Sequence, residues 1–149
     1  MLLALEFAAI SQLVDWPDGF LDELRSHGFR LIRHDNRDAG LSTMVDAPTP
    51  TKPELARAAA ARRWATSSYL VDDMAADAVA VLDELGLEWA HVVGLSMGAM
   101  IAQQIAISDP SRVRSLTSVM SSTGSRRVGR PTLAVLRHFL RARPTRDTA

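Results

Sequence analysis

The chain has 149 residues, enough for one domain with its own core and too few for two of ordinary size. Its 47% hydrophobic and 23% charged residues are typical of a soluble globular protein, and 17 basic residues balance 17 acidic ones, which indicates no nucleic-acid partner. The absence of cysteine excludes disulfides, thiolate metal sites and a cysteine nucleophile.

The apolar N-terminal segment, Met1–Val14, does not have the pattern of a signal peptide. It starts without basic residues, is interrupted by Glu6 and contains no small-x-small cleavage site. No stretch of the chain approaches the roughly 20 apolar residues that span a bilayer. We therefore expect a cytoplasmic protein without a membrane partner.

The first part of the chain alternates apolar runs with turn residues. Leu2–Phe7 predicts a buried strand, and apolar residues at helical spacing after Trp16–Gly19 predict a helix that ends before Gly28. Phe29–His34 predicts a second strand, and the polar segment after it, Asp35–Gly40, is typical of a turn.

A longer connection leads to the clearest helix of the sequence. Two prolines in Asp46–Lys52 predict a loop, and the alanine-rich segment Glu54–Trp64 predicts a helix. Asp72–Leu85 has one continuous apolar stripe, and Gly86 stands where a left-handed C-terminal cap belongs.

The last part continues the alternation of strands and helices. Ala90–Val93 predicts a strand, Met97–Ser108 a helix that Pro110 terminates, and Arg114–Met120 a further strand. Thr132–Arg141 is a basic amphipathic stretch. Strands that alternate with helices of this length form right-handed βαβ units around a parallel sheet, so the predicted fold class is α/β.

The pentapeptide Gly94-Leu95-Ser96-Met97-Gly98 lies between a predicted strand and a predicted helix, the position of a nucleophile elbow. In such a turn the serine is strained and its hydroxyl stands above the sheet, while the two glycines avoid clashes that a Cβ would make. Ser96 is therefore the candidate nucleophile. The backbone amide of Met97, at a helix N-terminus, is a candidate oxyanion donor.

With this motif, the segments Arg33–Ser42, Tyr69–Ala75, Ala90–Met100 and Asp109–Gly124 resemble the α/β-hydrolases. The similarity is to the esterase-like subgroup that includes aclacinomycin methylesterase, and it covers about residues 2 to 145. It implies that a serine attacks the carbonyl of a small-molecule carboxylic ester, with a histidine as base and an acid that orients it. It implies no cofactor and no metal ion.

The resemblance also implies a partial α/β-hydrolase fold, a central parallel sheet of about four strands flanked by helices. These strands correspond to the third to sixth of the family and are expected in the order 4-3-5-6. Residues 1–124 would form the core, and residues 125–149 the basic, partly disordered start of a cap region. Because the family's neighbouring strands have no counterpart here, we expect a chain truncated at both ends that self-associates through its sheet edges.

The oxyanion segment and the catalytic triad depart from the family pattern. Ala8 replaces the usual glycine, so the second oxyanion amide would belong to Ala9, which resists positive φ. After Ser96 the only histidine is His138, and the only acids are Asp109 and Asp147. None of these three matches the family's acid or base, so we expect an impaired enzyme.

The remaining polar residues have simpler interpretations. His34, at a strand end, is conceivable as a substitute base, although a packed or solvated histidine is the default. His91 is interpreted as a strand-start residue and His27 as a helix C-terminal residue. Asp35 and Asp38 are interpreted as turn residues, with an Arg37 ion pair that fixes the loop.

Three functions remain open from the sequence. The first is an esterase-type hydrolase with Ser96 as nucleophile. The second is a non-catalytic remnant that needs a complementing chain. The third is an interaction module that uses the seven arginines between Arg126 and Arg146.

Overall fold

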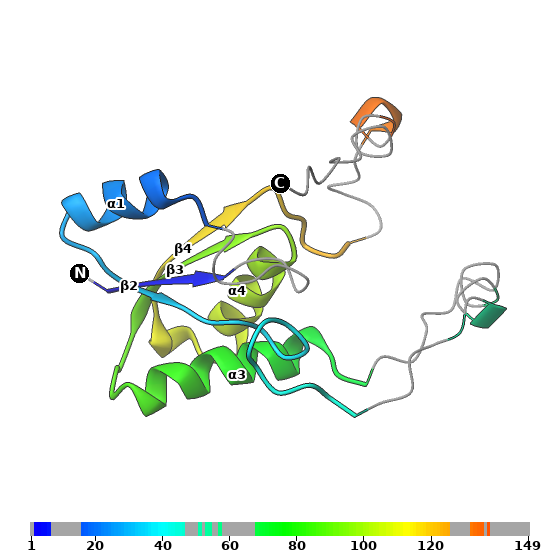
Figure 1. Cartoon of the computed structure of the whole chain (residues 1–149), viewed down its shortest axis with the longest axis horizontal. Coiled ribbons are helices and arrows are strands. Elements are labelled where there is room, and N and C mark those ends of the chain that lie inside the picture. Colours follow the sequence, from blue (N-terminus) through cyan, green and yellow to red (C-terminus); the bar gives the residue numbers. More distant parts are fainter. Residues whose placement is uncertain are drawn as a thin grey trace, which may run out of the picture.

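The structure is a computed structural model and describes residues 2–6, 16–46, 51, 53–54, 57, 68–125, 132–135 and 137. The predicted strands, and the helices on either side of the elbow, are present (Figure 1). The labelled elements are β1 (Leu2–Glu6), α1 (Asp18–Ser26), β2 (Arg30–Arg33), α3 (Val71–Glu84), β3 (Ala90–Leu95), α4 (Met97–Ser108), the 3-10 helix η2 (Pro110–Arg112) and β4 (Val113–Val119).

The described strand boundaries lie within one residue of the prediction except at the end of β3, which was predicted wrongly. The strand expected to end at Val93 continues through Gly94 to Leu95, both of which pair with β4. Gly94 is part of the strand and does not end it. A glycine is needed there because α4 approaches so closely that a Cβ would clash with its backbone. Most of the predicted helix Glu54–Trp64 lies outside the described residues, and of Thr132–Arg141 the described positions 133–135 and 137 are helical.

The strands form one parallel sheet in the order β2-β1-β3-β4. Leu3 of β1 is in register with Leu31 on one side and with His91 on the other, and Val93 of β3 is in register with Thr117 of β4. This is the order predicted from the family resemblance, with β1 to β4 standing for the third to sixth strands. Among the described strands, β2 and β4 are the outer two.

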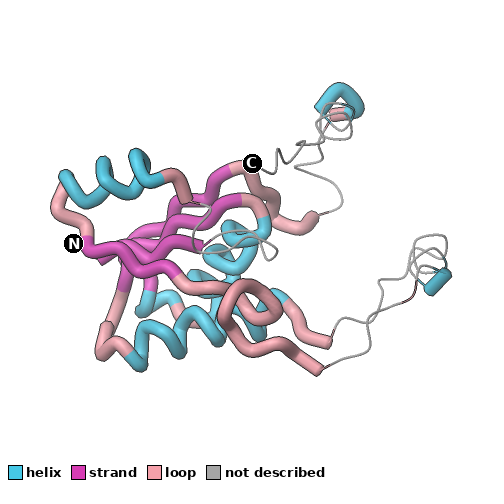
Figure 2. Tube along the Cα trace, in the orientation of Figure 1, coloured by secondary structure: helices cyan, strands magenta, loops and turns pink. Residues whose placement is uncertain are grey.

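Helices cover both faces of the sheet, with α1 on one side and α3 and α4 on the other (Figure 2). Alternation along β3 divides the core, because successive side chains of a strand point to opposite faces. Val92 packs with Ile101 of α4 in the larger cluster, and Val93 packs with Leu21 of α1 in the smaller one.

The helix α3 ends as the sequence predicted. Gly86 has φ +65°, its amide donates to the carbonyl of Asp83 at 2.9 Å, and the amide of Leu87 donates to the carbonyl of Leu82 at 2.9 Å. A left-handed residue at this position allows the chain to satisfy the last helical carbonyls and turn into β3.

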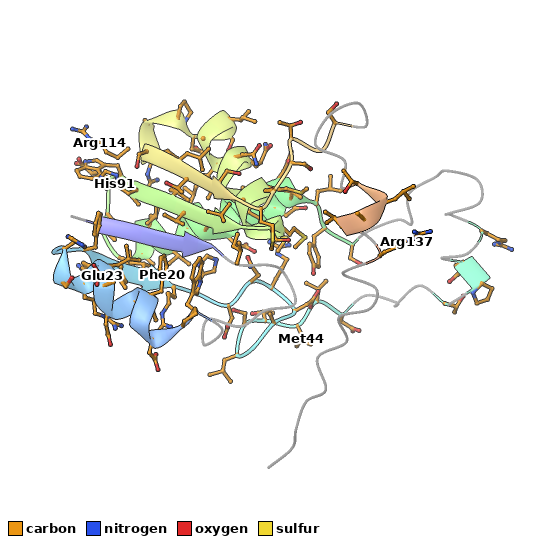
Figure 3. The ribbon with its side chains drawn as sticks, turned by 90° about the horizontal axis from the view of Figure 1, so that it is seen from above. Phe20, Glu23, Met44, His91, Arg114 and Arg137 are labelled. Carbon is orange, nitrogen blue, oxygen red and sulfur yellow. The ribbon has the colours of Figure 1, made fainter. Side chains whose placement is uncertain are left out.

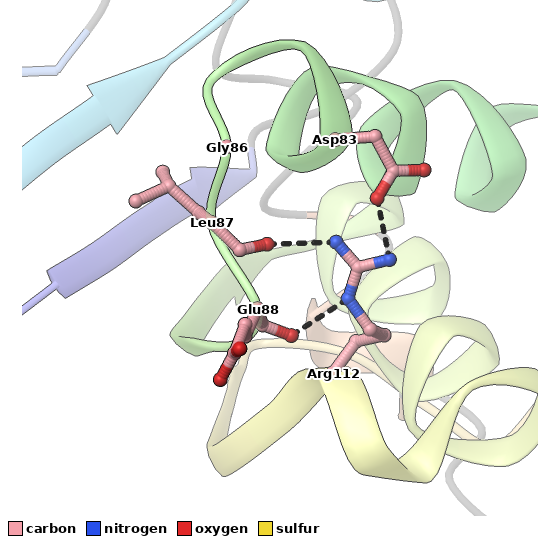
Figure 4. A pocket seen from close by; sticks show the side chains of 5 residues that line it. All are labelled: Asp83, Gly86, Leu87, Glu88 and Arg112. Atoms are coloured by element: carbon pink, nitrogen blue, oxygen red, sulfur yellow. Dashed lines mark hydrogen bonds and ion pairs between the residues drawn. The ribbon is translucent and has the colours of Figure 1, made fainter.

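Arg112 holds the connection between α3 and β3 (Figure 4). Its guanidinium donates to the carbonyls of Glu88 at 2.7 Å and Leu87 at 2.9 Å, and it forms a 2.7 Å ion pair with Asp83. The Arg112 side chain is only 18% exposed. The three acceptors are reached by three different nitrogens of the planar guanidinium, whereas a lysine carries its three N–H donors on a single nitrogen. The sequence did not reveal this contact.

Replacement of Arg112 with alanine is expected to lower the free energy of unfolding by about 2 kcal/mol, because two charge-assisted hydrogen bonds to backbone carbonyls and the ion pair with Asp83 are lost. Urea denaturation measures the change. The matched control is Arg25→Ala, which removes an exposed ion pair with Asp22 and is expected to cost less than about 0.5 kcal/mol. Equal losses in the two variants would contradict the role given to Arg112.

Candidate active site

Ser96 forms the turn between β3 and α4. Its backbone has φ +57° and ψ −118°, outside the regions that most L-residues occupy. Such a conformation costs about 1–3 kcal/mol and persists only where the surroundings impose it. The strand–turn–helix arrangement predicted around Ser96 is therefore present, together with the strain that the motif requires.

Gly94 allows α4 to start directly against β3. A Cβ on Gly94 would lie 2.5 Å from Cα and 2.6 Å from the amide nitrogen of Ala99, and closer still to the carbonyl oxygen of Gly98. These are backbone atoms, so no rotamer change relieves the clash. Glycine at this position is a steric requirement of the turn, as the motif predicted.

Two hydrogen bonds connect the elbow to its neighbours. The amide of Ser96 donates to the carbonyl of Val119 in β4 at 2.9 Å, and the carbonyl of Ser96 accepts from the amide of Ala99 at 3.2 Å. The first bond attaches the serine to the adjacent strand, and the second starts the helix. The position of Ser96 is thus determined by β3, β4 and α4 together.

Gln103 ties α4 to the end of β4, a contact the sequence did not suggest. Its side-chain amide donates to the carbonyl of Ala99 at 3.1 Å, to the hydroxyl of Ser118 at 3.3 Å and to the carbonyl of Ser122 at 3.4 Å. The available signal was a glutamine within an otherwise mainly apolar helix. Gln103 acts by positioning the strand that accepts the Ser96 amide.

Of the two predicted oxyanion donors, Met97 lies within the described residues and Ala9 does not. Met97 is the first residue of α4, where a backbone amide has no acceptor within the helix and the helix dipole favours negative charge. Ala9, the predicted second donor, and Ala8 lie outside the described residues.

His34 lies just after β2, at the carboxyl edge of the sheet, the edge where Ser96 follows β3. It lines a cavity of about 400 Å³ with Asp35, Arg37 and Asp77. The described residues that line this cavity come from the segment after β2 and from α3, and Ser96 is not one of them.

The other described histidines lie away from the elbow. His91 begins β3, about 16 Å of strand before Ser96, and its Nδ1 is 2.7 Å from the hydroxyl of Ser115. Figure 3 shows His91 near Arg114. His27 follows α1 and is 3.1 Å from the carboxylate of Glu23. Neither can reach the Ser96 hydroxyl.

The acids downstream of the elbow do not complete a triad within the described residues. Asp109 caps the C-terminus of α4, about 18 Å along the helix from Ser96. Asp147 and His138 lie outside the described residues.

The turn after β2 is fixed by its own carboxylates, as predicted. The amide of Leu41 donates to Asp35 at 3.1 Å, and the amide of Val45 donates to Asp38 at 2.6 Å. Hydrogen bonds from the Val45 amide and then the Tyr69 hydroxyl lower the pKa of Asp38. Burial, followed by the bond to Asp38, raises the pKa of Tyr69.

Arg37 anchors this turn on α3. Its guanidinium makes two hydrogen bonds to the Asp77 carboxylate, at 2.6 and 2.7 Å, and lies 5.1 Å from the centre of the Tyr69 ring. The hydrogen bond to Asp77 raises the pKa of Arg37 further above its usual value. The sequence predicted an Arg37 ion pair but not its partner.

Among the described residues no three histidine, aspartate or glutamate side chains form a group able to hold a metal ion. No helix in the described part of the chain is long and apolar enough to cross a membrane. Ser96 combines a positive φ with a position at the N-terminus of a helix.

Comparison with known proteins agrees with this geometry. The family model for the alpha/beta hydrolase fold matches residues 8–142. The chain belongs to the α/β-hydrolase fold family. It is 37% identical over 105 residues to rhodomycin D methylesterase DnrP of Streptomyces peucetius, and 31% identical over 100 residues to the putative carbamate hydrolase RutD of Variovorax paradoxus.

The matches cover most of this α/β-hydrolase chain and a minor part of its relatives. The two aligned regions span 70% and 66% of this chain and 30% of each relative. A hydrolase from Pseudomonas aeruginosa superposes with a TM-score of 0.64 at 29% identity, over 81% of this chain and 37% of that one. The chain thus spans about a third of the length of these hydrolases.

The strain at Ser96 predicts an inverted order of stability for two substitutions. Ser96→Gly is expected to unfold with a free energy about 1 kcal/mol higher than Ser96→Ala, because glycine adopts a φ of +57° without steric cost. Ser108, the last residue of α4, is the matched control: there alanine is expected to be more stable than glycine by about 0.5 kcal/mol. Urea denaturation compares the four variants, and the same order at both sites would contradict the strain.

Proposed function

We propose that this chain supplies the nucleophile of a serine hydrolase that acts on carboxylic esters. Ser96 attacks the carbonyl carbon, and the amide of Met97 binds the developing oxyanion. The observation that carries the proposal is the backbone of Ser96, with φ +57°, between the end of β3 and the first turn of α4. Esterases among the relatives support the choice of an ester substrate.

Ester hydrolysis by a serine needs a nucleophile with an oxyanion donor, and a base that takes up the hydroxyl proton. The elbow provides the nucleophile and the donor. Attack forms a bond from the Ser96 oxygen to the carbonyl carbon, the electron pair of the C=O bond moves to oxygen, and the hydroxyl proton passes to a base. Collapse of this intermediate expels the alcohol and leaves an acyl group on Ser96, which water then removes. Of the described histidines only His34 follows a strand at the same edge of the sheet as Ser96, and the cavity of about 400 Å³ that it lines is not lined by Ser96. The described residues therefore support an oxyanion donor and a nucleophile, without a positioned base.

Without a base the serine is expected to react slowly. Loss of triad members lowers rates by about 10⁴- to 10⁶-fold, while the oxyanion site and substrate binding retain some catalysis. We therefore expect low esterase activity from this chain alone, with higher activity in any form that brings a histidine to Ser96.

A fluorophosphonate probe tests the nucleophile directly. The wild-type chain is expected to be labelled at Ser96 slowly, about 10⁴-fold or more below a complete serine esterase, and Ser96→Ala is expected to lose the label. Mass spectrometry of peptides locates the modified residue.

Ser115→Ala is the matched control, because Ser115 contacts His91 at 2.7 Å but lies within a strand and not in an elbow. Its labelling should equal that of the wild type. Equal labelling of the wild type and Ser96→Ala would reject Ser96 as a nucleophile in this chain and favour a non-catalytic interaction module.

A further inference from the structure

The residue that follows β4 has an unusual backbone conformation. The strand ends at Val119, and Met120 comes next with φ +50°. A residue other than glycine rarely adopts a positive φ, because its Cβ then comes too close to the following carbonyl oxygen. Such a conformation persists only where the surroundings impose it. Met120 is 66% exposed, so burial of its side chain is not the cause, and the bonds of its neighbours must hold the turn.

Gln103 of α4 contacts the chain on both sides of Met120. Its side-chain nitrogen Nε2 donates to the hydroxyl of Ser118 at 3.3 Å, two residues before Met120, and to the carbonyl of Ser122 at 3.4 Å, two residues after it. The same nitrogen donates to the carbonyl of Ala99 at 3.1 Å, one turn earlier in α4, which fixes the direction of the side chain. One side-chain amide thus attaches both arms of the turn to the helix.

The acceptors around Gln103 determine which end of its side-chain amide faces the turn. Backbone carbonyls accept hydrogen bonds and cannot donate them, so the NH₂ group must lie against the carbonyls of Ala99 and Ser122. A carboxylate of the same shape has no hydrogen to donate and would place its oxygens against two other oxygens. The contact therefore requires a donor at this position, and a side chain of equal length does not suffice.

The turn at Met120 controls the acceptor of the Ser96 amide. The carbonyl of Val119, which accepts from Ser96 at 2.9 Å, belongs to the peptide plane that ends at the nitrogen of Met120. A change of φ at Met120 therefore rotates this carbonyl relative to the residues that Gln103 holds. In the described part of the chain the hydroxyl of Ser121 is buried without a hydrogen-bond partner, so the Ser121 side chain adds no bond to the turn.

We propose that Gln103 is a positioning residue for the nucleophile. By holding the chain on both sides of Met120, its side-chain amide keeps this residue left-handed and keeps the Val119 carbonyl against the amide of Ser96. Gln103 acts through this turn and does not take part in the reaction itself. The inference rests on the proposed function only in that Ser96 is the nucleophile, and the Ser96 amide reports on the contact without any substrate.

Gln103→Glu tests the proposal, because it removes the donors and keeps the shape of the side chain. At about pH 7 the new carboxylate is ionised. In hydrogen exchange followed by NMR, the Ser96 amide should exchange about tenfold faster relative to the β3 amides than in the wild type. Protection of the β3 amides in the same spectra shows that the variant is folded. Gln104→Glu is the matched control: it adds the same charge to α4 about 100° further around the axis, and the ratio should change less than about twofold.

Met120→Gly in the Gln103→Glu background tests the connection through the turn. Glycine adopts a positive φ without the cost of a Cβ, so the turn should persist without Gln103 and the exchange ratio should return to within about threefold of the wild type. Labelling of Ser96 by the fluorophosphonate should fall in Gln103→Glu and recover in the double variant.

Two results would overturn the proposal. Equal acceleration of the Ser96 and β3 amides in Gln103→Glu would reduce Gln103 to a general contribution to stability, and an exchange ratio that does not recover in the double variant would exclude the connection through Met120. A wild-type chain that is not labelled, while the exchange ratios change as expected, would reject Ser96 as the nucleophile and leave its positioning by Gln103 intact.

Discussion

The close contact between β3 and the start of α4 is the constraint on which the rest of the site depends. Gly94 leaves room for the backbone of Ala99, and this forces the intervening Ser96 into a left-handed conformation. The amide of Ser96 then reaches the carbonyl of Val119. The serine is held by sheet and helix backbone, so its geometry does not require a histidine or an acid beside it.

The same contact connects the site to the stability of the domain. The helix α4 buries Ile101 and Ile105 against the sheet, and Gln103 on its other side holds the end of β4. Arg112 holds the connection between α3 and β3 through its bond to the carbonyl of Glu88. Arg37 attaches the turn after β2 to α3 through its ion pair with Asp77. A strained residue persists where such packing exceeds its cost of about 1–3 kcal/mol.

The sequence predicted most of the fold because its local signals agree with one another. Apolar runs, the cap at Gly86 and the elbow glycines each specify backbone geometry within a few residues, and the family resemblance supplied the strand order. Contacts between distant segments were harder to predict: Arg37 with Asp77 and Arg112 with the carbonyl of Glu88 depend on side chains that only the folded chain brings together. The strand end at Leu95 was missed because a glycine in a strand has two meanings, a break or a close approach.

Hydrogen exchange of the Ser96 amide tests most directly whether the elbow is formed by the sheet and α4 alone. The bond to Val119 predicts that this amide is protected as strongly as the amides of β3, since both open only with the core of the domain. Exchange can be followed by NMR in the wild-type chain without any ligand. Exchange of the Ser96 amide at the rate of an unstructured peptide, while β3 remains protected, would contradict a preformed elbow.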